Sequence, residues 1–258
     1  MKFETKLTEG KLIQRYKRFF ADVEYTDPAT NQKMALTIHV PNTGSMKSVI
    51  EKPSQIQKCW FSLSDDPNRK LKGTLEAVQT LEGSWVGVNT SHPNKITAEV
   101  IQAGIASKQS HFKHWATYQF YKSEHKISKE TRLDGVFCLE ESHLVDAKAK
   151  KHFIEIKNTT LLNLVDGKKH AQFPDSVTER GQKHLMELTA LVKKGHKAEM
   201  IFTIQRNDVT AFSIASDIDP EYKKLFDKAV KVGVIVTPVL VDINLQEITL
   251  SQKVLPVE

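Results

Sequence analysis

The sequence has only two cysteines in 258 residues, Cys59 and Cys138, and they lie far apart without CxxC spacing. This scarcity argues against a disulfide framework and against a cysteine zinc site. The ten histidines show no HExxH or comparable ligand spacing, so we expect no zinc centre among them.

Long apolar runs are also absent. No stretch is long enough to cross a bilayer, and the N-terminal residues contain no apolar leader segment. We therefore expect a cytoplasmic protein with no membrane partner. No P-loop or GxGxxG pattern follows a strand-like run, which argues against a nucleotide cofactor. Nothing in the pattern bears on the oligomeric state.

The composition that remains is that of a folded globular protein, with 40% hydrophobic and 26% charged residues. A chain of 258 residues is expected to form two domains. The formal charge of +6 and the pI near 9.1 favour an anionic partner, although so modest an excess is common in proteins that bind no nucleic acid.

Basic and aromatic residues are interleaved at residues 11–20, where lysines and arginines alternate with Tyr16, Phe19 and Phe20. This mixture suits phosphate contacts combined with base stacking. A strand whose aromatic side chains enter a core would show the same pattern, and this alternative stays open.

Residues 7–85 contain short β-prone stretches separated by turn signals, which is typical of a small barrel or sandwich. An OB-like barrel is one candidate. The stretches span residues 21–25, 34–40, 59–63 and 75–81.

From residue 116 onward strands alternate with helices, which predicts an α/β structure with a mixed central sheet covered by helices. A short helix ending near Gly104 precedes this region. Pro238 places the last strand at a sheet edge or a bulge. The expected strands span residues 116–121, 133–139, 152–157, 200–205 and 234–241.

The two helices of this region carry clear signals. Ser176 begins a capping-box pattern, and an apolar stripe through Leu185 and Leu188 predicts that the helix packs on a sheet. Asp219 is expected to cap the second helix, which ends near Gly233.

The most informative pattern is the run HFIEIK, in which Glu155 and Lys157 are separated by one apolar residue. Alternation along a strand places both side chains on one face, with Ile154 and Ile156 in the opposite, apolar layer. Together with Asp134 in ETRLDGVF, they form a candidate catalytic group.

The chemistry implied by this group is phosphodiester hydrolysis. Asp134 and Glu155 are hard oxygen ligands that suit Mg²⁺ or Mn²⁺, and Lys157 can orient water or stabilise developing negative charge. A solvated sheet face or a cross-strand ion pair would show the same residues. The following helix brings Gln182 and Lys183 within reach of Glu155, unless they belong to a solvated helix face.

Several longer strings occur in order along the chain: LIQRYKRFFADV, HVPNTGSM, PNRKLKGTLE, VGVNT, TRLDGVF, FIEIKNTTL, FPDSVTERGQKHLMEL and IDPEY. In these strings the chain resembles the sugar fermentation stimulation protein A (SfsA) family, over about residues 7–255. The resemblance implies an OB-fold nucleic-acid-binding domain at residues 1–85 and a PD-(D/E)xK nuclease-like domain at residues 86–258. It also implies DNA binding without strong sequence preference.

Carried onto this chain, the resemblance implies that Glu124 joins Asp134 and Glu155 as a metal ligand. Arg132 matches a family arginine that could pair with a carboxylate or phosphate. The resemblance also implies a polar turn at residues 42–45 whose N–H groups could hold an anion, although such a turn needs no ligand to explain it. The implied DNA-contacting residues are Arg15, Lys17, Arg18, Arg69 and Lys70.

Three functions are compatible with the sequence. The first is a divalent-metal-dependent nuclease, in which the OB-like domain holds DNA and the second domain cuts it. The second is a non-catalytic DNA-binding regulatory protein affecting sugar (maltose) metabolism. The third, an enzyme acting on small phosphorylated metabolites, has the least support because no nucleotide-binding motif is present.

Overall fold

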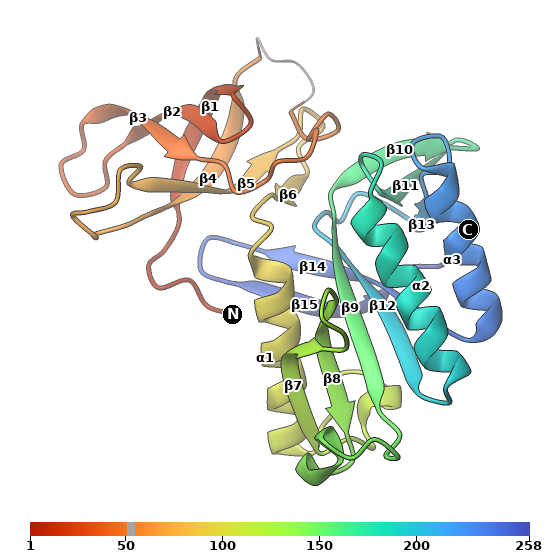
Figure 1. Ribbon diagram of the computed structural model, residues 1–258. Helices are drawn as coiled ribbons and strands as arrows, with labels where there is room; N and C mark the ends of the chain where they lie inside the picture. Colours follow the sequence, from red (N-terminus) through yellow and green to blue (C-terminus); the bar gives the residue numbers. More distant parts are fainter. Residues whose placement is uncertain (51–54) are drawn as a thin grey trace.

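The computed structural model describes residues 1–50 and 55–258, which form two domains connected by a short linker (Figure 1). The N-terminal domain is a β-barrel. The C-terminal domain is a mixed sheet with helices on both faces. Both domains have the fold class expected from the sequence.

The barrel is closed by a pairing between its third and fifth strands. The strands pair in the order β3-β2-β1-β4-β5-β6, and a parallel bridge between His39 of β3 and Thr74 of β5 closes the first five strands of this order into a barrel. Val23, Ile38 and Leu75 are among the apolar side chains that fill the interior. The strands are β1 (Thr8–Tyr16), β2 (Phe20–Thr26), β3 (Lys33–His39), β4 (Gln57–Leu63), β5 (Gly73–Gln79) and β6 (Trp85–Gly87).

The large sheet of the C-terminal domain has six strands in the order β15-β14-β12-β9-β8-β7. The three central strands β9, β12 and β14 are parallel, and the remaining pairs are antiparallel. The strands are β7 (Phe120–Lys126), β8 (Arg132–Cys138), β9 (His152–Thr159), β12 (Lys197–Ile204), β14 (Ile235–Ile243) and β15 (Ile248–Val254).

A second, three-stranded sheet lies beside the large one, and the sequence analysis did not anticipate it. It contains β10 (Leu161–Val165), β11 (Lys168–Phe173) and β13 (Ala211–Ile214). Strand β10 follows β9 after one residue, so this small sheet is a continuation of the chain that carries Glu155 and Lys157.

Helix α1 (His92–Ser107) covers one face of the large sheet, whereas α2 (Glu179–Lys193) and α3 (Pro220–Val232) cover the other (Figure 1). Side-chain alternation explains the two layers, because Ile154 and Ile156 belong to the core beneath α1 while their neighbours point to α2. No helix in the described ranges is long and apolar enough to span a bilayer.

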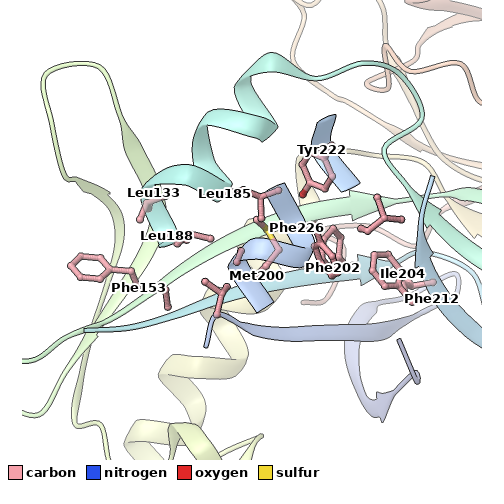
Figure 2. Close-up of a cluster of buried hydrophobic side chains, with 14 of the residues drawn as sticks. Leu133, Phe153, Leu185, Leu188, Met200, Phe202, Ile204, Phe212, Tyr222 and Phe226 are labelled. Atoms are coloured by element: carbon pink, nitrogen blue, oxygen red, sulfur yellow. The ribbon is translucent and has the colours of Figure 1, made fainter. Parts of the chain in front are cut away.

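The core between the sheet and α2 is shown in Figure 2. Leu185 and Leu188 of α2 pack against Met200 and Phe202 of β12, and all four side chains are essentially fully buried. The apolar stripe predicted for this helix is therefore confirmed.

Asp219 caps α3 as predicted. Its carboxylate accepts a hydrogen bond of 2.9 Å from the N–H of Tyr222, and Gly233 ends the helix in the left-handed conformation with φ 110°. The prediction that Ser176 caps α2 is wrong. Thr178 is the cap, because its hydroxyl accepts a hydrogen bond of 3.1 Å from the N–H of Gly181, and its own N–H donates to Asp219 at 2.9 Å.

Three other predicted boundaries differ from the structure. Strand β7 begins at Phe120, four residues later than predicted, because the 3₁₀ turn Lys113–Trp115 continues into a turn and an irregular segment at residues 116–119. Helix α1 continues past Gly104 to a left-handed cap at Lys108. Pro238 does not lie in an edge strand, since β14 pairs on both sides, but the register with β15 shifts immediately after it, as expected for a bulge.

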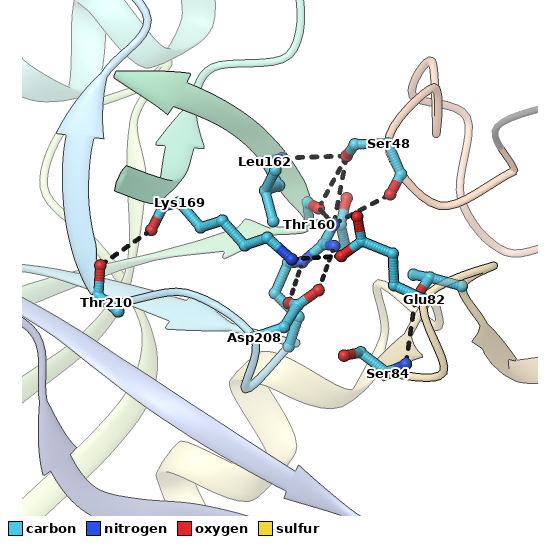
Figure 3. A network of polar contacts seen from close by, with 10 residues as sticks. Ser48, Glu82, Ser84, Thr160, Leu162, Lys169, Asp208 and Thr210 are labelled. Carbon is cyan, nitrogen blue, oxygen red and sulfur yellow. Dashed lines mark hydrogen bonds and ion pairs between the residues drawn. The ribbon is translucent and has the colours of Figure 1, made fainter. Parts of the chain in front are cut away.

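Arg206 joins the two domains. Its guanidinium donates from Nη1 to the carbonyl oxygens of Ser48 and Thr160, both at 3.0 Å, and pairs in a bidentate manner with Asp208 (Figure 3). The Ser48 hydroxyl accepts a hydrogen bond of 3.0 Å from the N–H of Leu162. The barrel is therefore held against the residues that directly follow β9.

The first residues of the chain also cross to the C-terminal domain. The N–H of Phe3 donates to the carbonyl of Gln246 at 2.9 Å, and the N–H of Leu7 donates to Leu245 at 2.8 Å. The N-terminal amine donates to the carbonyl of Ile248. Residues 1–7 thus form a strap from the barrel to the β14–β15 hairpin.

We expect Arg206→Ala to destabilise the protein by about 3–5 kcal/mol, because Asp208 loses its partner and two buried carbonyl groups lose a donor. Urea unfolding of the purified variant would measure the loss. Lys169→Ala, which removes only an ion pair with Glu82 at the same interface, should leave stability nearly unchanged. Equal losses in the two variants would contradict a central role for Arg206.

Candidate metal centre

Strands β8 and β9 separate at Asp134. The pairing of the two strands reaches Gly135, opposite Ile154, and ends there. The N–H of Ile156 donates instead to Oδ2 of Asp134 at 2.7 Å, and Asn94 in the first turn of α1 donates to Oδ1 at 2.8 Å. The carboxylate is therefore fixed by the backbone of one strand and by a helix.

Glu155 and Lys157 project from the same face of β9, as predicted. Glu155 is only 2% exposed, and its Oε1 accepts a hydrogen bond of 2.6 Å from the Lys157 ammonium group. A buried charge is costly unless it is paired. The ion pair satisfies this requirement on one of the two carboxylate oxygens.

His184 completes the group, although it is not among the site residues predicted from the sequence. The buried imidazole projects from α2, and its Nδ1 is in hydrogen-bond contact with Oε1 of Glu155. The same nitrogen lies 3.4 Å from Nζ of Lys157. A signal was present, because His184 lies four residues before Leu188 and therefore falls on the apolar stripe that faces the sheet.

Tyr222 is a second buried residue that the sequence did not reveal. Its hydroxyl has no hydrogen-bond partner among the residues described. Burial, with the charges of Glu155 and Asp219, raises the pKa of Tyr222 well above its ordinary value. Gly181 makes room for the ring, since a Cβ atom at this position would lie 3.0 Å from a carbon of Tyr222.

The two carboxylates are shifted in opposite directions. Burial and the nearby charge of Glu155 raise the pKa of Asp134, outweighing the hydrogen bond from Ile156 and the charge of Lys157. Burial alone would also raise the pKa of Glu155, but the hydrogen bonds and charges of His184 and Lys157 lower it. A negative pair results in which Asp134 is the less easily ionised member.

Asp134 and Glu155 fit a small divalent cation. Oε2 of Glu155 is buried and has no hydrogen-bond partner within the described ranges. Mg²⁺ is commonly bound by one or two carboxylates, with waters and phosphate oxygens completing its shell. Across residues 1–50 and 55–258, no group of three or more His, Cys, Asp or Glu side chains is arranged to hold a metal. Asp134 and Glu155 are thus the two described carboxylates that would hold such an ion.

Glu124 does not join this group. Its backbone is left-handed, with φ 54°, and its exposed side chain forms an ion pair of 3.0 Å with Arg132. The left-handed residue interrupts the regular alternation of β7, and this redirects the side chain. Arg132 thus neutralises Glu124 at the surface.

The two helix residues predicted to reach Glu155 have other partners. Gln182 donates to Asp219 at 2.9 Å, and Lys183 forms an ion pair of 2.8 Å with exposed Glu130. Positions 182 and 183 do not lie on the buried face of α2. That face contains Gly181 and, three positions later, His184.

Two of the five basic residues predicted to contact DNA have internal partners. Arg15 donates to the carbonyl oxygens of Asn42 and Gly44, at 2.8 and 3.1 Å, and Arg69 donates to the hydroxyl of Thr74. Burial, with a contribution from the charge of Arg18, lowers the pKa of Arg15. Arg15 and Arg69 therefore brace the barrel loops.

The other three, Lys17, Arg18 and Lys70, are exposed. Lys17 and Arg18 form the left-handed turn between β1 and β2, beside Phe19, which is 47% exposed. Tyr16 and Phe20 stack with ring centroids 5.6 Å apart, outside the barrel core. The alternative in which these aromatic residues enter a core is therefore wrong.

The polar turn at residues 42–45 already holds an anion from the protein. Asp175 accepts a hydrogen bond of 3.2 Å from the N–H of Ser45, and the N–H of Gly44 donates to Asn42 at 2.8 Å. A Cβ atom at Gly44 would clash with the Asp175 carboxylate at 2.2 Å. The turn thus contributes to the contact between the domains.

Comparison with known proteins identifies the family. Residues 91–247 match the sugar fermentation stimulation protein RE domain, and residues 13–88 match the SfsA N-terminal OB domain. A sugar fermentation stimulation protein homologue of Bdellovibrio bacteriovorus is 49% identical over 261 residues and covers the whole of both chains. The chain belongs to the SfsA family.

Other SfsA relatives match over nearly the same length. The homologue of Pelagibacter ubique is 40% identical, with 98% of each chain covered. The solved structure of Pyrococcus furiosus SfsA in complex with Ca²⁺ superposes with a TM-score of 0.74, covering 100% of this chain and 98% of that one. At 21% identity, this likeness shows the shared fold.

We expect Asp134→Asn to raise the melting temperature at pH 7. A carboxyl whose pKa is higher in the folded than in the unfolded state is destabilising once ionised, and asparagine removes that charge. The cost appears as the pH rises above the ordinary value of 3.8, so the gain should vanish at pH 3.5. Thermal melts at both pH values test this, and a variant less stable at pH 7 would contradict it.

Proposed function

We propose that this SfsA protein is a divalent-metal-dependent nuclease, in which the barrel holds DNA and the centre on β9 hydrolyses a phosphodiester bond. Mg²⁺ or Mn²⁺ at Asp134 and Glu155 would activate water and neutralise charge on the phosphate. Lys157 supplies the remaining positive charge, which orients the attacking water or stabilises the phosphate as it is attacked.

The free oxygen of Glu155 is the observation that carries this proposal. Within residues 1–50 and 55–258, two other glutamates are buried, and both have partners on each oxygen. Glu199 contacts His114 and Thr237 through Oε1 and Trp115 through Oε2. Glu76 accepts hydrogen bonds from the partners Ser62, Asn89 and His92.

A buried carboxylate oxygen without a donor is energetically unfavourable, because it has lost water and gained nothing in return. Glu155 accepts both of its donors on Oε1 and leaves Oε2 without one. The nearby Asp134 adds a second negative charge, and among the described residues it forms no salt bridge, whereas Glu155 pairs with Lys157. Both features favour a bound positive ion at this position.

The solved relative supports the same class of ion. The Pyrococcus furiosus protein is described as a complex with Ca²⁺. Calcium, magnesium and manganese all prefer oxygen ligands, and carboxylates serve all three. We extend this to Asp134 and Glu155 of the present chain.

The barrel supplies the DNA contacts in this proposal. Lys17, Arg18 and Lys70 are exposed, and Phe19 is available for stacking. Phosphate contacts carry no sequence information, so we expect binding without strong sequence preference.

We expect the purified protein to cut labelled linear, circular or single-stranded DNA in Mn²⁺ or Mg²⁺ and to be inactive in EDTA. Glu155→Ala and Lys157→Ala should each lower the cleavage rate by about 100-fold or more, because each removes a charge from the reacting centre. Gel assays of the three DNA forms measure the rates.

Met186→Ala is the matched control, since Met186 lies on the same helix as His184 and is 51% exposed. It should cut like the wild type. DNA that is shifted on a gel but left uncut under every metal condition would overturn the nuclease proposal. The non-catalytic DNA-binding protein would then be the better interpretation.

We expect DNA affinity to fall steeply with salt. Replacing both Lys17 and Arg18 by alanine should reduce the log–log slope for duplex DNA by about 1.8, because each phosphate contact contributes about 0.9. Lys228→Ala, which removes an exposed charge from α3, should leave the slope unchanged. Fluorescence anisotropy over a salt series measures this, and an unaltered slope in the double variant would exclude this loop from the contact.

A further inference from the structure

We propose that His184 is a positioning residue that sets which oxygen of Glu155 is offered to the metal ion. This inference rests on the proposed function. The imidazole of His184, on α2, forms a hydrogen bond with Oε1 of Glu155. This bond fixes the orientation of the carboxylate, so that Oε2 stays free to bind the ion.

Two side chains donate hydrogen bonds to the carboxylate of Glu155. An ionised carboxylate only accepts hydrogen bonds, so Nδ1 of His184 carries the proton and donates it to Oε1. Lys157 donates to the same oxygen at 2.6 Å. Two donors from two different elements, one on β9 and one on α2, prevent the carboxylate from rotating. Lys157 alone could donate to either carboxylate oxygen, because its ammonium group is carried on a flexible four-carbon chain.

The His184 side chain is itself held in a fixed position by the packing of α2. His184 is 4% exposed and lies in the second turn of α2. The helix is fixed at its start by the Thr178 cap, and Leu185 and Leu188 hold it on the sheet. The imidazole is therefore a rigid group, anchored by the core and independent of any ligand.

A purely structural buried histidine is the competing explanation, and the chain offers one for comparison. His170 on β11 is 1% exposed, and its Nδ1 contacts the hydroxyl of Ser213 at 3.0 Å. Both histidines are buried, and Nε2 of His170 lies 3.4 Å from the carboxylate of Glu258. His184 differs in that its carboxylate partner, Glu155, is itself buried and has a free second oxygen, whereas the Glu258 side chain is 41% exposed.

The test is calorimetric titration of the full-length protein with Mn²⁺, and separately with Ca²⁺, without DNA. His184→Ala should weaken binding by about 10–100-fold, the usual effect of removing a residue that orients a ligating side chain. His184→Asn places an amide N–H where Nδ1 was and should bind close to wild type. His184→Gln places its amide at the Nε2 position and should resemble alanine.

His170→Ala is the matched control, which should lower the melting temperature while leaving Mn²⁺ affinity unchanged. Unchanged affinity in His184→Ala, with affinity lost in Glu155→Ala, would overturn the inference and leave the nuclease proposal standing. If alanine at position 184 prevents folding, equal affinities of the asparagine and glutamine variants would overturn it. A wild-type protein that binds neither ion would overturn both proposals.

Discussion

The C-terminal domain depends on one constraint, the presence of a negative charge in the middle of its sheet. Glu155 lies on a central strand between two apolar layers, where an unpaired charge would cost several kcal/mol. Lys157 on the same strand and His184 on the covering helix compensate it. Helix α2 is therefore positioned by a polar contact as well as by the apolar stripe that packs on the sheet.

The same strand determines where the barrel is placed. Thr160, immediately after β9, accepts a hydrogen bond from Arg206, which also reaches Ser48 of the barrel. The barrel is thus held at the carboxyl ends of the parallel strands, the edge at which open α/β sheets commonly bind ligands. Lys157 lies two residues before the end of β9. In the proposed function, a nucleic acid held by the barrel would therefore lie close to Asp134 and Glu155.

Features that depend on residues close together in the sequence, such as the cap of α3 and the alternation of side chains along a strand, were predicted correctly. Asp219 caps α3 because its side chain and the residue that it serves are three positions apart, and strand alternation alone places Glu155 beside Lys157. The cap of α2 was predicted at Ser176, whereas Thr178 caps the helix, and the Thr178 N–H donates a hydrogen bond to Asp219, the distant residue that caps α3. Helical spacing places His184 on the face of α2 that packs on the sheet, but it does not reveal the partner there, because Glu155 lies 29 positions away in the sequence.

The strap formed by residues 1–7 has a consequence for the order in which the protein is completed. The barrel strands leave the ribosome first and can pair with one another early. The strap, however, docks on the β14–β15 hairpin, which lies more than 200 residues later in the sequence, and Met1 contacts Ile248. At about 5–20 residues per second, this partner is synthesised roughly 10–50 s later. The N-terminus of the chain is therefore among the last parts to reach its native place.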